Sequence, residues 1–182
     1  MIDADRTLVL YGDGAREAAR RMLPGLPDAR FVPAGAPGEP GPTRLRAAFK
    51  EAVKAELTQV VLVAGMDEQA RFLGGVWGVA GVLESITRDM GGDAALAAAV
   101  AEAPTLRDAY DRWEAAGILG PCGRELCRRT AGELERLAAE TAEAASSPAA
   151  GSPAAGSPVA AQVVMVDPEG ERMVGMYGRM AR

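Results

Sequence analysis

Histidine is absent from the 182 residues of this sequence, and its absence excludes several kinds of catalytic site. A Ser-His-Asp triad, a zinc ion held by imidazoles and an imidazole general base each require a histidine. Proton transfer in this protein would therefore depend on carboxylates, tyrosine, lysine or cysteine.

Cysteine is also scarce, since only Cys122 and Cys127 are present. Two cysteines are too few for a cysteine-only metal cage or a secreted disulfide framework, so we expect no zinc, haem or iron–sulfur site. Cys122 follows Gly120-Pro121 near the start of a predicted helix, where the pKa of a thiol can be lowered. Cys122 is therefore a candidate reactive thiol, and a half-buried apolar cysteine is the alternative.

Basic charge and long apolar runs are both limited. The formal net charge is −5, which does not favour binding to nucleic acid or to an anionic membrane. The uncharged stretch 72–83 would cover about 18 Å as a helix, which is too short to cross a bilayer. The N-terminus is acidic and lacks the features of a signal peptide, so we expect a cytoplasmic protein.

The first third of the sequence alternates between strand and helix patterns. Apolar runs at 7–11, 29–32 and 59–64 predict strands, and amphipathic patterns at 15–23 and 43–57 predict the helices between them. This order is typical of right-handed parallel crossovers. The sequence therefore predicts an α/β fold, specifically a Rossmann-like three-layer sandwich with a mainly parallel sheet.

The remainder of the chain departs from this regular order. Helical patterns at about 68–90, 93–101, 105–116 and 122–145 predict a large helical segment after the third strand. Residues 146–161 repeat Ala-Ala-Gly-Ser-Pro and predict a flexible linker. Two apolar runs at 162–166 and 172–177 flank Asp167-Pro168-Glu169-Gly170 and predict a β-hairpin.

Three parts of the chain follow from these patterns. Residues 1–145 form an α/β domain with a helical subdomain at about 68–145, residues 146–161 form the linker, and residues 162–182 form the hairpin. An isolated hairpin is marginally stable in water, so we expect it to return to the edge of the sheet. Pairing with another subunit is the alternative.

Two strand-end loops are the candidate binding site, because ligands of open parallel sheets bind beyond the carboxyl ends of the strands. Each loop combines glycine, acidic residues and arginine, and the eight candidate ligand-binding residues are Gly12, Asp13, Gly14, Arg16, Gly65, Asp67, Glu68 and Arg71. Asp13 and Asp67 are candidate ligands for Mg²⁺, which prefers oxygen donors. Acidic residues in a helix's first turn also stabilise the helix dipole without any ligand.

Two hypotheses about function remain open at this point. The first is a domain that binds a small anionic metabolite or nucleotide, bearing phosphate or carboxylate, as a Mg²⁺-assisted transferase or hydrolase. The second is a non-catalytic accessory or subunit protein that acts through contacts with itself or with a partner protein.

Overall fold

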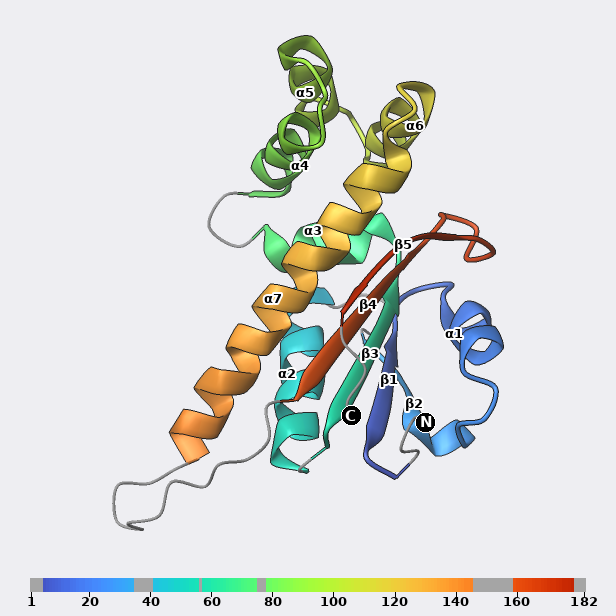
Figure 1. The fold of residues 1–182 in the computed structure, drawn as a ribbon, viewed down its shortest axis with the longest axis vertical. Coiled ribbons are helices and arrows are strands. Elements are labelled where there is room, and N and C mark those ends of the chain that lie inside the picture. The colour runs from blue at the N-terminus through green and yellow to red at the C-terminus, as the bar shows by residue number, and fades with distance from the viewer. Residues whose placement is uncertain (1–4, 35–40, 56, 75–77, 146–158, 179–182) are drawn as a thin grey trace.

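The computed structural model describes residues 5–34, 41–55, 57–74, 78–145 and 159–178. Its centre is a five-stranded sheet in the order β2-β1-β3-β4-β5 (Figure 1). All neighbouring strands are parallel except β4 and β5. The predicted α/β fold with a mainly parallel sheet is therefore confirmed. The strands are β1 (Thr7–Tyr11), β2 (Phe31–Pro33), β3 (Gln59–Ala64), β4 (Ala160–Val166) and β5 (Met173–Gly178).

The central strand β3 explains how the sheet is held together. Every residue of its sequence QVVLVA is buried, as expected for a strand that is covered on both faces. Thr7 to Tyr11 of β1 pair with Gln59 to Val63, and β4 pairs with the other side of β3 from Ala160 onward. The carboxyl ends of β1, β3 and β4 therefore meet at one end of the sheet.

Helices cover both faces of the sheet (Figure 1). Helices α2 (Gly41–Lys54), α3 (Met66–Leu73) and α7 (Leu119–Ala145) lie on one face, where Leu10, Phe49 and Leu62 belong to the larger core cluster. Helix α1 (Arg16–Met22) covers the other face with Ala18, Ala19 and its N-cap residue Ala15, and the short 3-10 helix η1 (Asp28–Arg30) precedes β2. Within the described ranges, none of the helices has the length and apolarity needed to span a bilayer.

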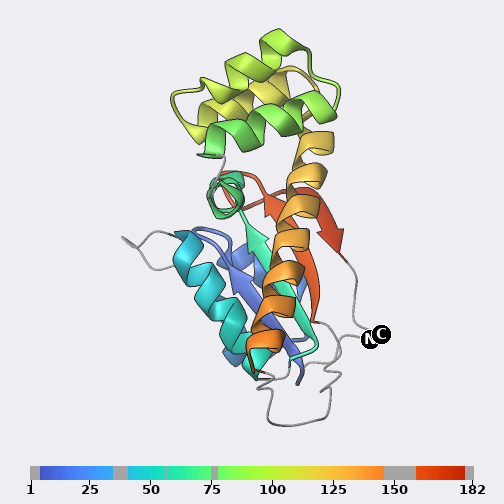
Figure 2. The ribbon, with the colours of Figure 1, turned by 90° about the vertical axis from the view of Figure 1, so that its left-hand side faces the viewer.

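Three helices extend beyond the carboxyl ends of the strands (Figure 2). They are α4 (Gly78–Asp89), α5 (Ala94–Ala101) and α6 (Leu106–Ala115). The expectation of one helix over about 68–90 is wrong, because α3 ends at its C-cap Gly74 and α4 begins at Gly78, where φ is +70°. Residues 75–77 between them lie outside the described residues, as do most of the predicted linker (146–158) and of the proline-rich stretch 33–42.

The C-terminal hairpin joins the sheet of its own chain. Its turn is closed by Asp167, whose Oδ1 accepts hydrogen bonds from the backbone N–H groups of Glu171 (2.8 Å) and Arg172 (3.1 Å). Gly170 in this turn has φ +71°, a conformation that favours glycine. Because β4 pairs with β3 and β5 pairs only with β4, β5 forms an edge of the described sheet.

An ion-pair network joins α4 to α7 and makes stability depend on pH. Glu125 accepts hydrogen bonds from Arg128 (2.6 Å) and Arg129 (2.8 Å), and Arg129 also binds Asp89 (2.6 Å) on α4. The hydrogen bond from Arg128, followed by that from Arg129, lowers the pKa of Glu125 from 4.5 to about 2. The network is therefore a stabilising feature only while Glu125 is ionised.

We predict that Glu125→Gln makes the free energy of unfolding depend less on pH in the acidic range. A group with a lowered folded pKa stabilises the protein above its unfolded pKa, and this contribution is lost as the pH falls from 4.5 toward 2. The loss is on the order of 2 kcal/mol, after a reduction for solvent screening at the exposed Arg128. Urea unfolding at about pH 6 and about pH 3 measures it. Glu84→Gln, which removes an exposed ion pair, is the control, and an unchanged pH dependence in Glu125→Gln would contradict this role.

Candidate functional site

A cleft of about 400 Å³ lies at the carboxyl ends of β1, β3 and β4. The loop after β1 and the start of α3 form one side, and α6 together with the residues after β4 forms the other. Five of the eight predicted ligand-binding residues line it: Asp13, Gly65, Asp67, Glu68 and Arg71. The other lining residues are Met66, Thr105, Leu106, Arg107, Tyr110, Val166, Asp167 and Pro168.

Glu68 connects the two predicted loops. Its Oε1 accepts a hydrogen bond from the backbone N–H of Asp13 (3.0 Å), so a side chain from the start of α3 holds the loop after β1. A Cβ on residue 12 would overlap Oε2 of Glu68, so a larger residue there would displace the Glu68 carboxyl group. The N–H of Gly12 also donates to the carbonyl of Val63 (2.9 Å) and keeps this loop close to β3.

The environment of Glu68 changes its acidity. Burial raises the pKa of Glu68 above 4.5, and the nearby charges of Asp13 and Asp67 raise it further. The backbone hydrogen bond from Asp13 opposes this shift in part. Glu68 is thus a half-buried carboxyl group of increased proton affinity beside the cleft, and it is able to accept a hydrogen bond or interact with a cation.

The magnesium hypothesis gains no support from this arrangement. Asp67 Oδ1 forms an exposed ion pair with Arg71 Nε (2.7 Å) one helical turn away. In the part of the chain that the structure describes, no three Asp, Glu, Cys or His side chains cluster in a way that could hold a metal ion. Asp13 and Asp67 act here as cleft-lining carboxylates.

The three remaining predicted residues, Gly12, Gly14 and Arg16, are not part of the cleft lining. Gly14 has φ +71°, and its carbonyl packs against Gly170 of the hairpin turn. Arg16 is the exposed first residue of α1. Gly14 therefore has a packing role that its position in a glycine-containing loop did not reveal.

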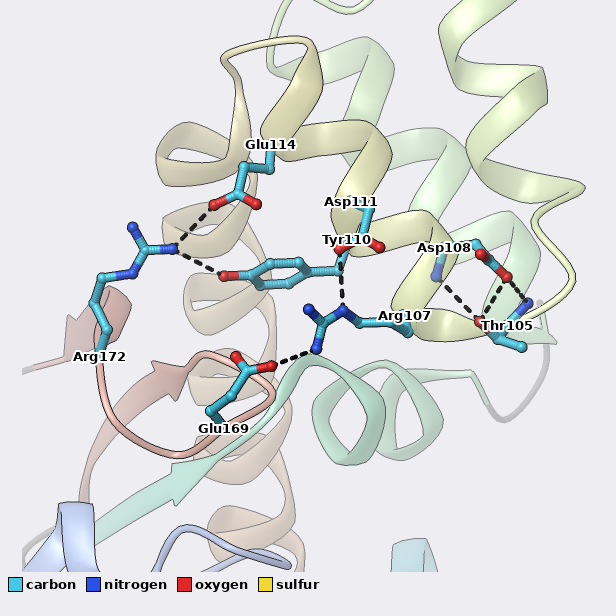
Figure 3. Close-up of polar contacts among 8 residues, drawn as sticks. All are labelled: Thr105, Arg107, Asp108, Tyr110, Asp111, Glu114, Glu169 and Arg172. Carbon is cyan, nitrogen blue, oxygen red and sulfur yellow. Dashed lines mark hydrogen bonds and ion pairs between the residues drawn. The ribbon is translucent and has the colours of Figure 1, made fainter.

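The α6 side of the cleft was not predicted from the sequence. Arg107 forms ion pairs with Glu169 of the hairpin turn (2.6 Å) and with Asp111 (3.1 Å), as Figure 3 shows. In the other direction, Arg172 reaches from the hairpin to Glu114 (3.0 Å) and to the hydroxyl of Tyr110 (3.4 Å) on α6. These reciprocal contacts hold α6 beside the hairpin turn and thereby define the width of the cleft.

The start of α6 is well determined by its sequence. Thr105 and Asp108 form a capping box, in which each side chain accepts a hydrogen bond from the other residue's backbone N–H. This cap places Arg107 and Tyr110 on successive turns facing the cleft. Burial raises the pKa of Tyr110 above 10, which keeps its hydroxyl protonated at neutral pH, and Arg172 opposes the shift.

Cys122 is not the reactive thiol that its sequence position suggested. It lies in the first turn of α7, but its side chain is fully buried, and burial raises its pKa to about 12. Glu125, one turn along the helix, adds to this shift. Cys127 is also buried, with a pKa of about 12. Both residues are core components.

We predict that neither cysteine reacts with iodoacetamide in the folded protein at about pH 8, because less than about one thiol in a thousand would be ionised. Both should react once the protein is unfolded in guanidinium chloride. Mass spectrometry of intact protein counts the labels, and rapid labelling of Cys122 in the folded state would restore the hypothesis of an activated thiol.

The fold and the cleft together define an α/β domain with a ligand-sized cleft at the carboxyl ends of parallel strands. Residues 78–175, which include just over half of the chain, match the model of the CbiD C-terminal domain. The chain therefore belongs to the CbiD family. The matched region contains α6, β4 and the hairpin turn, which form one side of the cleft.

Two curated relatives extend this similarity over almost the whole chain. Both are described as cobalt-precorrin-5B C(1)-methyltransferase, one from Salinispora arenicola (strain CNS-205) and one from Salinispora tropica (strain ATCC BAA-916). Each is 36% identical over 187 residues, and each match covers 98% of this chain and 43% of the relative. The chain thus spans less than half the length of these relatives. No solved structure matches the chain.

These findings correct the function expected from the sequence. The chain belongs to the CbiD family, and the two curated relatives that it matches are described as methyltransferases. The hypothesis of a generic phosphate-binding transferase or hydrolase is therefore wrong. The glycine and acidic loops that suggested phosphate chemistry carried too little information to identify a substrate.

Proposed function

We propose that this chain forms part of a cobalt-precorrin-5B C(1)-methyltransferase, and that its strand-end cleft binds the methyl donor. The observation that carries the proposal is the 36% identity to two such enzymes over 98% of the chain. In this proposal the protein acts in the cytoplasm, the location predicted from its sequence. The cobalt in the name of the substrate belongs to the tetrapyrrole and is not a resident metal of the protein.

The position of the cleft supports a binding role. The strand order reverses between β1 and β3, because β2 lies on one side of β1 and β3 on the other. In open α/β sheets the ligand crevice lies at such a reversal, outside the carboxyl ends of the strands. Asp13 follows β1 and Gly65 follows β3, so the cleft occupies this place. The same order supports the Rossmann-like sandwich predicted from the sequence.

The size and charge of the cleft favour the donor over the tetrapyrrole. A volume of about 400 Å³ is within the range of pockets for small ligands, about 300–1,000 Å³. Transfer of a methyl group to carbon requires an electrophilic methyl, such as that of the sulfonium in S-adenosylmethionine. The amino-acid portion of this donor carries an ammonium and a carboxylate. Asp13 and Glu68 would attract the ammonium, and Arg71 and Arg107 would attract the carboxylate.

Isothermal titration of S-adenosylmethionine into the protein tests this role. We expect binding by the wild type, and affinity about tenfold weaker, or about 1.4 kcal/mol, for Glu68→Gln, which keeps the shape of the side chain and removes its charge. Glu84→Gln removes an exposed carboxylate on α4, outside the cleft, and is the matched control. Absence of binding by the folded wild type, or equal affinity in Glu68→Gln, would overturn the assignment of the cleft.

A further inference from the structure

The edge strand β5 has an unusual surface. It has a neighbouring strand on one side only in the part of the chain that the structure describes. The large hydrophobic side chains that are exposed among the described residues are Met173 (52%), Met176 (46%) and Tyr177 (47%), and all three belong to β5. The strongest exposed apolar feature of the described molecule therefore coincides with an open sheet edge.

This edge carries neither charge nor proline to prevent strand addition, and the one irregularity in its pairing with β4 lies between Met165 and Val166. Exposed edge strands are typically very short or carry charged residues or proline. The opposite edge β2 follows this rule, since it has three residues and ends at Pro33. By contrast, β5 has six residues, MVGMYG, with no charge and no proline. Its open backbone is suited to pairing with another strand.

The strand is also held firmly in place. Gly175 packs directly on the backbone of α7, where a Cβ would lie 2.6 Å from the carbonyl carbon of Gly123. On the inner side, β5 pairs with β4 from Met173 to Gly178. The edge is thus a preformed template, and a strand added to it would need little reorganisation of this chain.

Both faces of the edge offer apolar contacts to an added strand. Tyr177 lies opposite Val163, whose side chain belongs to the core on the α7 face. Met176 lies opposite Val164, which belongs to the core on the α1 face. An incoming strand with apolar side chains on both of its faces would therefore extend both cores.

We propose that β5 accepts a β-strand from the portion of the methyltransferase that this chain does not match. The relatives are more than twice as long as the matched region, which covers 43% of their length. The matched family model is itself called a C-terminal domain, which indicates that proteins of the family contain a further part. This inference rests on membership of the family and is independent of whether the cleft binds the methyl donor.

Hydrogen exchange measured by mass spectrometry tests the proposal. The comparison is between this chain alone and a hybrid in which it replaces the matched region of the Salinispora arenicola enzyme. We expect the β5 amides that do not bond to β4 to exchange at least about tenfold more slowly in the hybrid. The amides of β3, which is buried in both proteins, are the internal reference.

Substitutions at the edge separate strand addition from general stabilisation. Met176→Glu combined with Tyr177→Glu should restore fast exchange of β5 in the hybrid, whereas Ala98→Glu on the exposed side of α5 should not. Light scattering of this chain alone should show a monomer. Equal exchange of β5 in both proteins, or a dimer of this chain that the edge substitutions dissociate, would overturn the proposal. If the hybrid fails to fold, the same measurement is made on the intact Salinispora arenicola enzyme. We then expect slow exchange in the strand that aligns with residues 173–178, and fast exchange there would overturn the proposal.

Discussion

Replacement of Trp113 by alanine is expected to lower the free energy of unfolding by about 3–5 kcal/mol, the usual cost of truncating a large buried aromatic side chain. Trp113 on α6 is fully buried, and its Nε1 donates a hydrogen bond to Oγ1 of Thr87 on α4 (2.8 Å). The hydroxyl of Thr87 in turn donates to the carbonyl of Leu83 (2.7 Å). The indole therefore fills the space between two helices and satisfies a buried hydroxyl.

Urea unfolding monitored by circular dichroism measures this effect, with Trp113→Phe as the matched variant. Phenylalanine retains much of the buried ring and removes the N–H donor, so its cost should be smaller, about 1–2 kcal/mol. Equal destabilisation by the two substitutions would mean that the hydrogen bond, rather than the volume, dominates. Because α6 carries Arg107 and Tyr110, the alanine variant should also weaken ligand binding at temperatures where it remains folded.

A methyl group added at Gly175 is expected to destabilise the protein by about 2–3 kcal/mol, in the range of overpacked cores. In Gly175→Ala, the new Cβ would lie 2.6 Å from the carbonyl carbon of Gly123 and 2.8 Å from the backbone nitrogen of Arg124. Both of these atoms belong to the backbone of α7, so neither can move aside as a flexible side chain would. The strand β5 must then separate from α7.

The opposite result is expected for the same substitution elsewhere on α7. Gly132 has no heavy atom near the position of an added Cβ, so Gly132→Ala should stabilise the helix by about 0.5–1 kcal/mol. Thermal and urea unfolding of both variants provide the comparison. If Gly175→Ala were as stable as the wild type, the close packing of β5 on α7 would not be a determinant of the fold.

The local patterns of the sequence predicted the sheet well, because they reflect burial. A run such as QVVLVA in β3 is apolar at nearly every position only when both faces are covered, and the hairpin runs around Asp167-Pro168 carry a similar signal. The helix pattern over 68–90 was misleading because its apolar spacing continues past the break between Gly74 and Gly78. A positive φ at Gly78 depends on tertiary context that the spacing does not contain.

The sequence predicted the residues on only one side of the cleft. Asp13, Asp67 and Glu68 follow strand ends, so general rules for α/β sheets place them in the cleft. Arg107 and Tyr110 reach the same cleft from a helix about forty residues further along, through contacts with Glu169 and Arg172 that no local pattern encodes. Asp167 could have been found, because it follows the end of β4, which is the next parallel strand.

None of these sequence patterns identifies the ligand. Acidic and glycine-containing strand ends occur with many ligands, and the absence of histidine excludes mechanisms without selecting one. The proposal of a methyl donor rests on the similarity to two methyltransferases and not on these patterns.

The most direct test of the account is methyl transfer by the hybrid Salinispora arenicola enzyme that carries this chain. The hybrid is incubated with cobalt-precorrin-5B and S-adenosylmethionine, and mass spectrometry of the tetrapyrrole detects the added methyl group. We expect a singly methylated product, activity at least about tenfold lower with Glu68→Gln, and unchanged activity with Glu84→Gln. A correctly folded hybrid that binds the tetrapyrrole but forms no methylated product, or one that is indifferent to Glu68→Gln, would contradict the placement of methyl transfer at this cleft.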